Sequence, residues 1–264
     1  MTTTSGDKVE TLVCIKRVPA TGARITLTED AQEIDTRNLG FTISPHEECA
    51  VEEAVQISEK HGGTTTVLTL GPEAAVEQLR QSLSVGIDRA VHLQTDGREW
   101  APMVTAAAIV EAIQAEQNDG RSFDLLLFGN EAADSGDYQV GVRVAHALNY
   151  PCLTGVKALE VRQEEGVVEA RREANGGWEV YELPLPAVIA VKEGINLPRY
   201  PSVPGRLRAK KKPVVSSEPE WRAGGLEKVR LMSPPEQGSS VEILGDSAAT
   251  VPQIVQILED LRLL

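Results

Sequence analysis

The segment FDLLLFGNEAADSGDYQVGVRVAHAL, residues 123–148, contains the junction on which the predicted fold depends. Its first six residues are almost all apolar and predict a buried β-strand, and the residues after 138 follow a helical pattern. The turn between them combines small residues with Asp134, Asp137 and Tyr138 but contains no lysine. Because ligands of open α/β sheets lie beyond the carboxyl ends of the strands, this turn is a candidate binding loop.

Strand and helix patterns alternate through the first 150 residues, which predicts right-handed crossovers and a mainly parallel sheet flanked by helices. The glycine fingerprint GxGxxG does not follow the first strand, where KRVPATG stands, so a standard dinucleotide-binding dehydrogenase is disfavoured. Residues 24–35 alternate around an acidic turn and predict a hairpin. The predicted strands are 11–17, 64–70, 89–95 and 123–128, and the predicted helices are 44–63, 72–86, 102–117 and the segment after 138.

The helix that starts at SPHE has the strongest local signals in the chain. Ser44 can cap it, Pro45 falls at its first position, and Glu47 completes a capping box. Gly62 can end it. Its predicted buried face is Ala50, Val51, Ala54, Val55 and Ile57.

The pattern changes after Pro151. Residues 156–194 predict antiparallel strands with turns at 165–166 and 175–176, and 194–212 predicts a proline-rich, basic loop. Residues 214–247 are polar and aperiodic, and 251–264 predicts an amphipathic helix that either folds back or docks on a partner. We therefore expect one α/β domain over 1–213 and an extended arm with a terminal helix over 214–264.

Composition and motifs exclude several classes of protein. A formal net charge of −13 disfavours nucleic-acid binding, and the sequence has neither an apolar run long enough to span a bilayer nor a signal peptide. The three scattered cysteines are typical of reduced thiols, so we expect a cytoplasmic protein. The four histidines lack metal-ligand spacing, and no catalytic motif occurs, so we expect neither a metal site nor a catalytic acid or base.

Two segments have both a structural and a functional interpretation. The loop from Ala133 to Val144 is either a plain connection in which an aspartate caps the helix, or an anion site made of backbone amides. The run RLRAKKKP at 206–213 is either a solvated face or a loop that meets an acidic partner.

Five motifs in register resemble the β subunit of electron-transfer flavoproteins. VCIKRV (13–18) is similar to the first strand of that family, SPHEECAVEEAV (44–55) to its helix start, and TLGP (69–72) to a strand-to-helix turn. EARREANGGWEVYELPLPAVIAV (169–191) resembles its signature hairpin, and NLPRYPSVPGRLRAKKKP (196–213) resembles its recognition loop. The resemblance covers almost the whole chain.

The resemblance implies an adenine-nucleotide-binding subunit of a heterodimer. The partner is an α subunit that holds most of a shared, redox-active FAD, and this chain binds AMP. DYQVG (137–141) also resembles a motif of electron-bifurcating members, which use NADH and bind a second FAD instead of AMP. We favour AMP, because Tyr138 occupies room that a second flavin ring would need. The cofactor-binding residues carried over from the family are Cys14, Ser44, Pro45, His46, Glu47, Leu70, Gly129, Ala133, Asp134, Ser135, Gly136, Asp137, Tyr138, Gln139, Val140, Gly141, Val142, Arg143 and Val144.

The family resemblance also implies an electron carrier rather than a self-contained enzyme. Its partners are flavin dehydrogenases, such as acyl-CoA dehydrogenases, and a membrane quinone oxidoreductase, with no direct membrane insertion. We expect Ile195 to anchor the recognition loop on a dehydrogenase, with Leu197 as the alternative. A nucleotide-sensing protein without a redox role is the remaining alternative. The expected partner-binding residues are Ile195, Leu197, Arg199, Tyr200, Arg206, Arg208, Lys210, Lys211 and Lys212.

Overall fold

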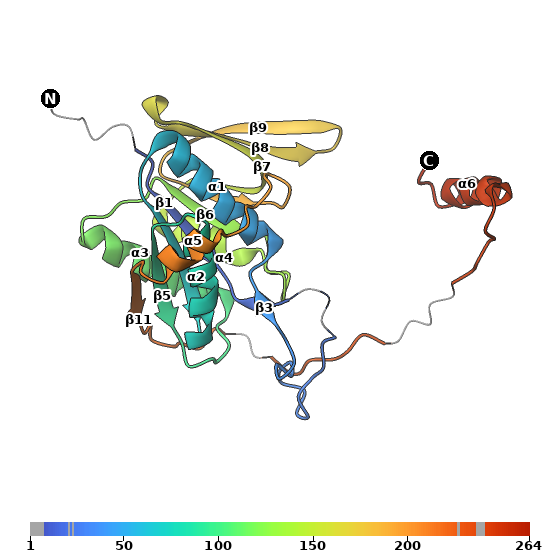
Figure 1. Cartoon of the computed structure of the whole chain (residues 1–264), viewed down its shortest axis with the longest axis horizontal. Helices are drawn as coiled ribbons and strands as arrows, with labels where there is room; N and C mark the ends of the chain where they lie inside the picture. The colour runs from blue at the N-terminus through green and yellow to red at the C-terminus, as the bar shows by residue number, and fades with distance from the viewer. Residues whose placement is uncertain (1–7, 21, 23, 226–227, 236–240) are drawn as a thin grey trace.

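The computed structural model describes the chain except for residues 1–7, 21, 23, 226–227 and 236–240 (Figure 1). A nine-stranded sheet runs through it in the order β11-β5-β4-β1-β6-β10-β7-β8-β9. Strands β11 through β7 pair in parallel, and β7, β8 and β9 pair antiparallel. The predicted α/β fold with an antiparallel extension is confirmed. The strands of the sheet are β1 (Thr11–Ile15), β4 (Thr65–Gly71), β5 (Arg89–Gln94), β6 (Leu125–Gly129), β7 (Cys152–Arg162), β8 (Val167–Ala174), β9 (Gly177–Pro184), β10 (Ala187–Val191) and β11 (Val214–Ser217).

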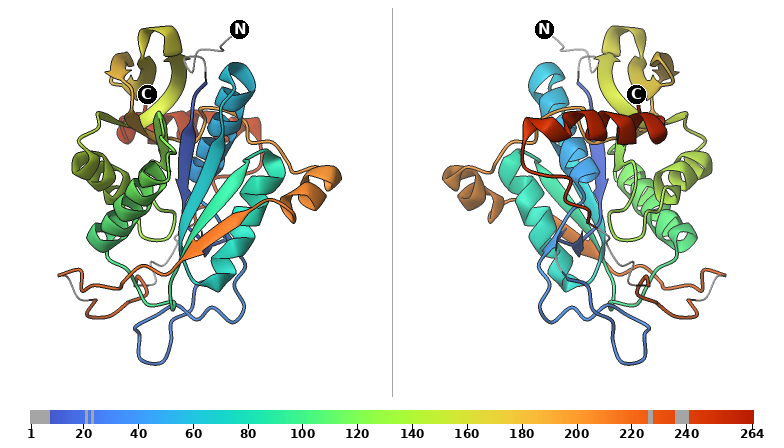
Figure 2. Two further views of the ribbon diagram at one scale, coloured as in Figure 1. Left: turned by 90° about the vertical axis from the view of Figure 1, so that its left-hand side faces the viewer. Right: turned by 90° about the vertical axis from the view of Figure 1, so that its right-hand side faces the viewer.

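Helices cover both faces of the parallel strands, as Figure 2 shows. Successive residues of β1 explain this arrangement, because side chains alternate across a strand. Val13 and Ile15 pack in the cluster under α1 (Pro45–His61) and α2 (Val76–Val85). Leu12 and Cys14 pack in the opposite cluster, with α3 (Pro102–Asn118) and α4 (Gln139–Leu148). A strand buried on both faces favours a nearly continuous apolar run, and four of the five residues of TLVCI are apolar.

Helix α1 begins with the capping box that its sequence predicts. The Ser44 hydroxyl accepts a hydrogen bond from the Glu47 N–H at 3.2 Å, and the Glu47 carboxylate accepts from the Ser44 N–H at 3.0 Å. Pro45 occupies the first turn and Gly62 the C-cap. The predicted apolar face is buried, so this helix is confirmed from its first residue to its last.

Three segments differ in detail from the sequence-based expectation. The predicted hairpin at 24–35 is reduced to one antiparallel bridge, Leu27 to Ile34, and the nearby ladder is the short pair β2 (Val18–Pro19) and β3 (Phe41–Thr42). The segment AVIAV joins the parallel sheet between β6 and β7. The basic loop contains a short helix, α5 (Val203–Ala209), whose N-cap is Ser202. Burial between β6 and β7 explains the placement of AVIAV, which local patterns do not report.

The C-terminal residues add an edge strand and then leave the sheet. Strand β11 pairs with β5, so the sheet extends to residue 217, four residues beyond the expected domain end. Helix α6 (Val251–Asp260) forms where the amphipathic pattern predicts it and is drawn apart from the sheet in Figure 1. Its side chains Ile254, Val255 and Ile257 are exposed. Within the described residues, no helix has the length and apolarity needed to cross a membrane.

The turn between α1 and β4 gives a prediction about stability. Gly63 has a φ of +100°, and a Cβ there would lie 2.1 Å from the Val9 carbonyl oxygen. Gly120 has a similar φ of +84°, but no described atom lies within 4 Å of the position its Cβ would take. Gly63→Ala should lower the free energy of unfolding by about 2–4 kcal/mol, because a steric clash adds to the backbone strain. Gly120→Ala should cost about 1 kcal/mol, from strain alone.

Denaturant unfolding of the two variants measures the difference. Equal losses of stability would show that the contact with Val9 relaxes without cost.

Candidate functional site

A cavity of about 750 Å³ lies beyond the carboxyl ends of β1, β4 and β6. The chain builds the sheet outward from β1 to β4 and β5, and then returns through α3 to place β6 on the other side of β1. Such a reversal of strand order separates the loops on either side and leaves a crevice between them. The volume is within the range of small-molecule sites.

The cavity brings together many of the cofactor-binding residues expected from sequence. Those in its lining are Cys14, Glu47, Leu70, Gly129, Ala133, Asp134, Ser135, Asp137, Tyr138, Val140, Gly141 and Val142. Those outside the lining are Ser44, Pro45, His46, Gly136, Gln139, Arg143 and Val144, which support the wall or face away from it. Ser44 and Val144 are fully buried, so they pack the wall from behind.

The loop at 130–138 is closed by its own backbone. The Ala132 N–H donates to the Asp137 carbonyl at 3.0 Å, and the Gly136 N–H donates to the Ala132 carbonyl at 2.8 Å. Gly136 has a φ of +67°, which favours glycine at this turn. No described side chain caps α4, whose N-cap is Tyr138. The amides of its first turn therefore remain available to an anion.

Asp134 has a different role from helix capping. Its carboxylate binds the Lys16 ammonium at 2.8 and 2.7 Å, and Lys16 directly follows β1. The cation that the loop lacks in its own sequence thus comes from the neighbouring strand end. This pair fixes the loop relative to β1 and places a positive charge beside the cavity.

Glu47 is a buried carboxyl group in the cavity wall. One oxygen accepts from the Lys16 N–H at 2.9 Å and the other from the Ser44 N–H. A Cβ at Gly129 would lie 2.7 Å from the Glu47 Cγ, so β6 approaches this side chain closely. Burial raises the pKa of Glu47 to about 8, although the two backbone donors and the Lys16 charge favour its ionised form.

His46 joins the cavity loop to the start of the basic loop. Its Nδ1 accepts from the Glu193 N–H at 2.8 Å, which places the ring proton of the neutral histidine on Nε2. That nitrogen lies 3.3 Å from a Glu131 carboxylate oxygen. His46 therefore positions two loops and lies outside the cavity.

Gly141 and Cys14 have structural explanations. A Cβ at Gly141 would lie 3.1 Å from the Phe128 ring, so this glycine lets α4 approach β6. Burial raises the pKa of the Cys14 thiol well above its usual value, so it remains a neutral packing group.

Sequence reasoning missed several cavity residues. Lys16 and Arg17 follow β1, and the rule that ligands lie at strand ends could have found them. Arg17 stacks over Phe41, with 3.3 Å between the guanidinium carbon and the ring centroid. The segment from Thr95 to Trp100 follows β5, so the rule that ligands lie at strand ends could have found it as well. Two residues of the C-terminal arm, Lys228 and Leu231, also line the cavity and had no local signal.

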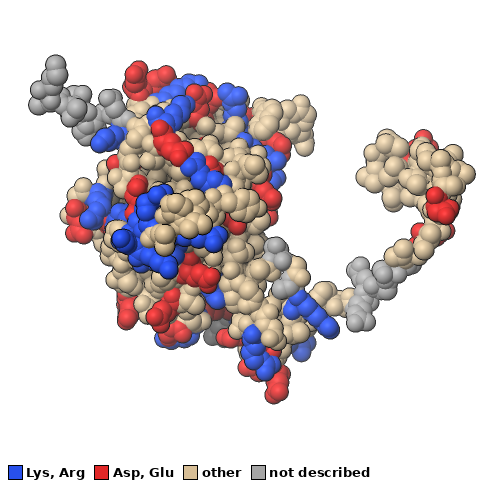
Figure 3. All heavy atoms as spheres, in the orientation of Figure 1, with Lys and Arg blue, Asp and Glu red and all other residues tan. Residues whose placement is uncertain are grey.

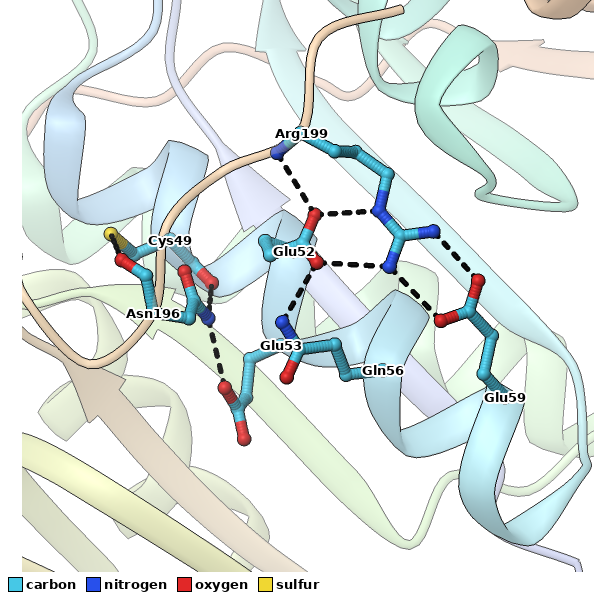
Figure 4. A network of polar contacts seen from close by, with 7 residues as sticks. All are labelled: Cys49, Glu52, Glu53, Gln56, Glu59, Asn196 and Arg199. Carbon is cyan, nitrogen blue, oxygen red and sulfur yellow. Dashed lines mark hydrogen bonds and ion pairs between the residues drawn. The ribbon is translucent and has the colours of Figure 1, made fainter.

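The basic loop is tied to α1 by a polar network (Figure 4). The Arg199 guanidinium binds Glu52 at 2.8 and 2.9 Å and Glu59 at 2.6 and 3.0 Å. These bonds hold the pKa of Glu59 below its usual value. The Asn196 amide donates to the Cys49 carbonyl at 3.0 Å and to Glu53 at 2.8 Å. Arg199, expected to bind a partner, is therefore engaged within the chain.

The loop between this network and α5 exposes several apolar side chains, which we call the loop patch. Ile195, the expected anchor, packs partly buried against the core, and Lys212 donates to carbonyls at the end of α2. Arg206, Arg208, Lys210 and Lys211 are exposed, and Figure 3 shows basic side chains gathered around α5. The exposed apolar side chains of the loop are Leu197 (89% exposed), Tyr200 (96%), Val203 (72%) and Leu207 (60%).

Within the part of the chain that the structure describes, no group of three or more His, Cys, Asp or Glu side chains is placed to hold a metal ion. The groups that the cavity offers to a ligand are backbone amides, two basic side chains after β1, and apolar side chains such as Leu70 and Ile109.

The sequence of the chain matches a known protein family. The electron transfer flavoprotein domain model matches residues 33–220. The electron transfer flavoprotein subunit beta of Bacillus subtilis (strain 168) is 33% identical over 253 residues, which cover 93% of this chain and 96% of the relative. The protein of the same name from Mycobacterium tuberculosis (strain ATCC 25618 / H37Rv) is 35% identical over 262 residues, covering 94% and 96%. A mitochondrial relative of that name from Oryza sativa subsp. japonica is 32% identical over 237 residues, covering 87% and 91%.

Glu47 gives a pH-dependent prediction. Its folded-state pKa of about 8 exceeds its ordinary value of 4.5, so its contribution to stability is complete below pH 4.5 and is lost as pH rises toward 8. Glu47→Gln removes this titration. The free energy of unfolding of the wild type minus that of the variant should decrease as the pH rises from 5 to 8, by up to about 1.4 kcal/mol per pH unit. Urea unfolding across this range measures it, and a flat or rising difference would contradict the assignment.

Proposed function

The chain belongs to the electron transfer flavoprotein family as a β subunit, and on that premise we propose that its cavity holds AMP within a flavin-containing heterodimer. The observation that carries the proposal is the loop at 130–138 beside the first turn of α4. No side chain in the described residues caps that turn, so its amides remain free for a phosphate at the carboxyl edge of the sheet. Lys16, which is paired with Asp134, and Arg17 line the same cavity.

The residues present fit a mononucleotide. Backbone amides and a helix N-terminus can neutralise a phosphate without a lysine in the loop itself. Apolar residues such as Leu70 and Ile109 supply a wall for the adenine ring. Tyr138 is half-exposed in the cavity wall, and the neighbouring Glu131 carboxylate raises the pKa of its phenol. A tyrosine held there favours AMP over a second flavin.

The partner in this proposal is an electron transfer flavoprotein α subunit, which holds most of the shared FAD. That flavin supplies the redox chemistry when bound, and this chain supplies binding and orientation. The exposed apolar side of α6, with Ile254, Ile257 and Leu261, is the element that we expect to dock on the α subunit. The three cysteines are free thiols, in keeping with the reducing cytoplasm in which we place the complex.

We assign the exposed loop patch to transient contact with flavin dehydrogenases, such as acyl-CoA dehydrogenases. The apolar side chains Leu197, Val203 and Leu207 form its centre, and the cations around α5 form its rim. A small patch of this kind suits fast exchange of partners, and rim charges mainly speed the encounter. The acceptor in the same scheme is a membrane quinone oxidoreductase.

A second candidate is the subunit of an electron-bifurcating flavoprotein that uses NADH. The sequence DYQVG lines the cavity in part, and the cavity volume of about 750 Å³ leaves room beyond a mononucleotide. Nucleotide extraction from the purified heterodimer separates the two candidates. One FAD and one AMP per heterodimer are expected, whereas two FAD would establish the second candidate. A colourless, monomeric chain with bound nucleotide would instead indicate a sensor.

The cavity assignment predicts the effect of a bulky side chain in the binding loop. Ser135→Tyr should lower AMP affinity by about tenfold or more, because a close backbone approach leaves no room for a ring. His146→Tyr, on an exposed turn of α4 outside the cavity, is the matched control. Calorimetric titration with AMP measures both variants. Undiminished affinity in Ser135→Tyr would place the nucleotide elsewhere.

The patch assignment predicts which apolar residues act in docking. The double variant Leu197→Ala/Val203→Ala should weaken dehydrogenase coupling by about 1–3 kcal/mol, with unchanged FAD content. Ile195→Ala should chiefly lower stability, because Ile195 packs against the core. Electron-transfer kinetics from a reduced acyl-CoA dehydrogenase measure the coupling. If Ile195→Ala alone impairs transfer at unchanged stability, Ile195 is the anchor and the patch assignment is wrong.

A further inference from the structure

Part of the cavity wall comes from residues 228–231 of the C-terminal arm. Lys228 and Leu231 of this arm line the cavity together with Arg98, Glu99 and Trp100. The sequence separation between Lys228 and Glu99 is 129 residues, so only the fold brings the two segments together. The arm is thus a component of the binding site as well as a connection to α6.

On one side, the arm is fixed to the segment that follows β5. The Lys228 ammonium binds the Glu99 carboxylate at 2.5 Å, and the Trp221 indole N–H donates to the Glu99 carbonyl at 3.3 Å. The Arg98 guanidinium carbon lies 4.9 Å from the Trp221 ring centroid. Glu99 therefore binds the arm through both its side chain and its backbone carbonyl.

On the other side, the arm is fixed to the turn at 28–33. The Leu231 N–H donates to the Ala31 carbonyl at 2.8 Å, and the Gln32 amide donates to the Val229 carbonyl at 2.9 Å. Residues 228–231 therefore bridge two loops, and both loops contribute to the cavity lining through Glu33 and Glu99. A segment that spans the two loops controls how far they can separate.

The contacts that hold the arm are individually weak. Most are hydrogen bonds or ion pairs between exposed groups, which water and salt compete for. A segment held in this way opens easily when nothing else favours the closed position. A ligand that touches the same wall adds contacts only to the closed form and shifts the equilibrium toward it.

We propose that residues 228–231 close the nucleotide cavity, so that nucleotide release requires the arm to detach from Glu99 and Ala31. The inference rests on the proposed nucleotide site. Because linkage is reciprocal, bound nucleotide also holds the arm against the domain.

The test uses the full heterodimer and AMP as the probe. Lys228→Glu breaks the pair with Glu99 and should raise the AMP dissociation rate about tenfold. Arg222→Glu is the matched control: it makes the same charge change on the same arm, but Arg222 pairs with Glu111 and lies outside the cavity lining. The swap Lys228→Glu/Glu99→Lys restores opposite charges and should restore slow release.

Hydrogen exchange provides a readout that a general loss of stability would not reproduce. AMP should slow amide exchange at residues 228–231 in the wild type and in the swap, and much less in Lys228→Glu. Wild-type release rates in Lys228→Glu, or equal effects of Lys228→Glu and Arg222→Glu, would overturn the proposal. The proposal would also be overturned if AMP slowed amide exchange at residues 228–231 in the swap variant, yet the variant released AMP rapidly.

Failure of the proposed AMP site is distinguishable from failure of this inference. If the wild type binds no AMP, the cofactor assignment is wrong, and FAD is then titrated in its place with the same variants. If FAD slows amide exchange at residues 228–231, the arm closes the cavity over a different nucleotide. If neither nucleotide slows exchange there, the proposed closure is refuted.

Discussion

The buried carboxyl group of Glu47 is the constraint on which the site depends. It accepts from the N–H groups of Ser44 and Lys16, and so fixes the start of α1 to the end of β1. The close approach of Gly129 brings β6 to the same point. Three elements that are distant in sequence therefore converge on one side chain. Withdrawal of that carboxyl from water raises its pKa and makes the junction sensitive to pH.

The positive charges near the cavity are likewise fixed by the backbone of β1. Lys16 and Arg17 leave the strand in succession, and alternation sends them to different partners, Asp134 and Phe41. Lys16 neutralises an aspartate of the binding loop, whereas Arg17 lies over an aromatic ring. In a protein with a net charge of −13, these two cations partly offset the acidic side chains that line the cavity.

Local signals predicted the elements, and long-range contacts decided the details. The capping box of α1, the apolar strands and the two hairpin turns could be predicted because each depends on residues within a few positions of one another. The pairs Lys16–Asp134 and Arg199–Glu52 could not, since 118 and 147 residues separate their members. The same limit explains why the partial burial of Ile195 could not be predicted: its core neighbours come from other parts of the chain. The arm residues at the cavity carried no local pattern at all.

Helix α1 also sets a condition for exchanging parts between relatives. Its first turn carries Glu47 at the cavity, and Glu52 and Glu59 further along hold the basic loop through Arg199. At about 1.5 Å per residue, the helix places Glu47 and Glu59 about 18 Å apart along one rigid axis. A chimera could carry the loop of another family member without the matching carboxylates of α1. The loop side chains would then be present, but they would not be held in the same positions. The conformation of the basic loop is therefore encoded in two distant segments, and only their joint transfer preserves it.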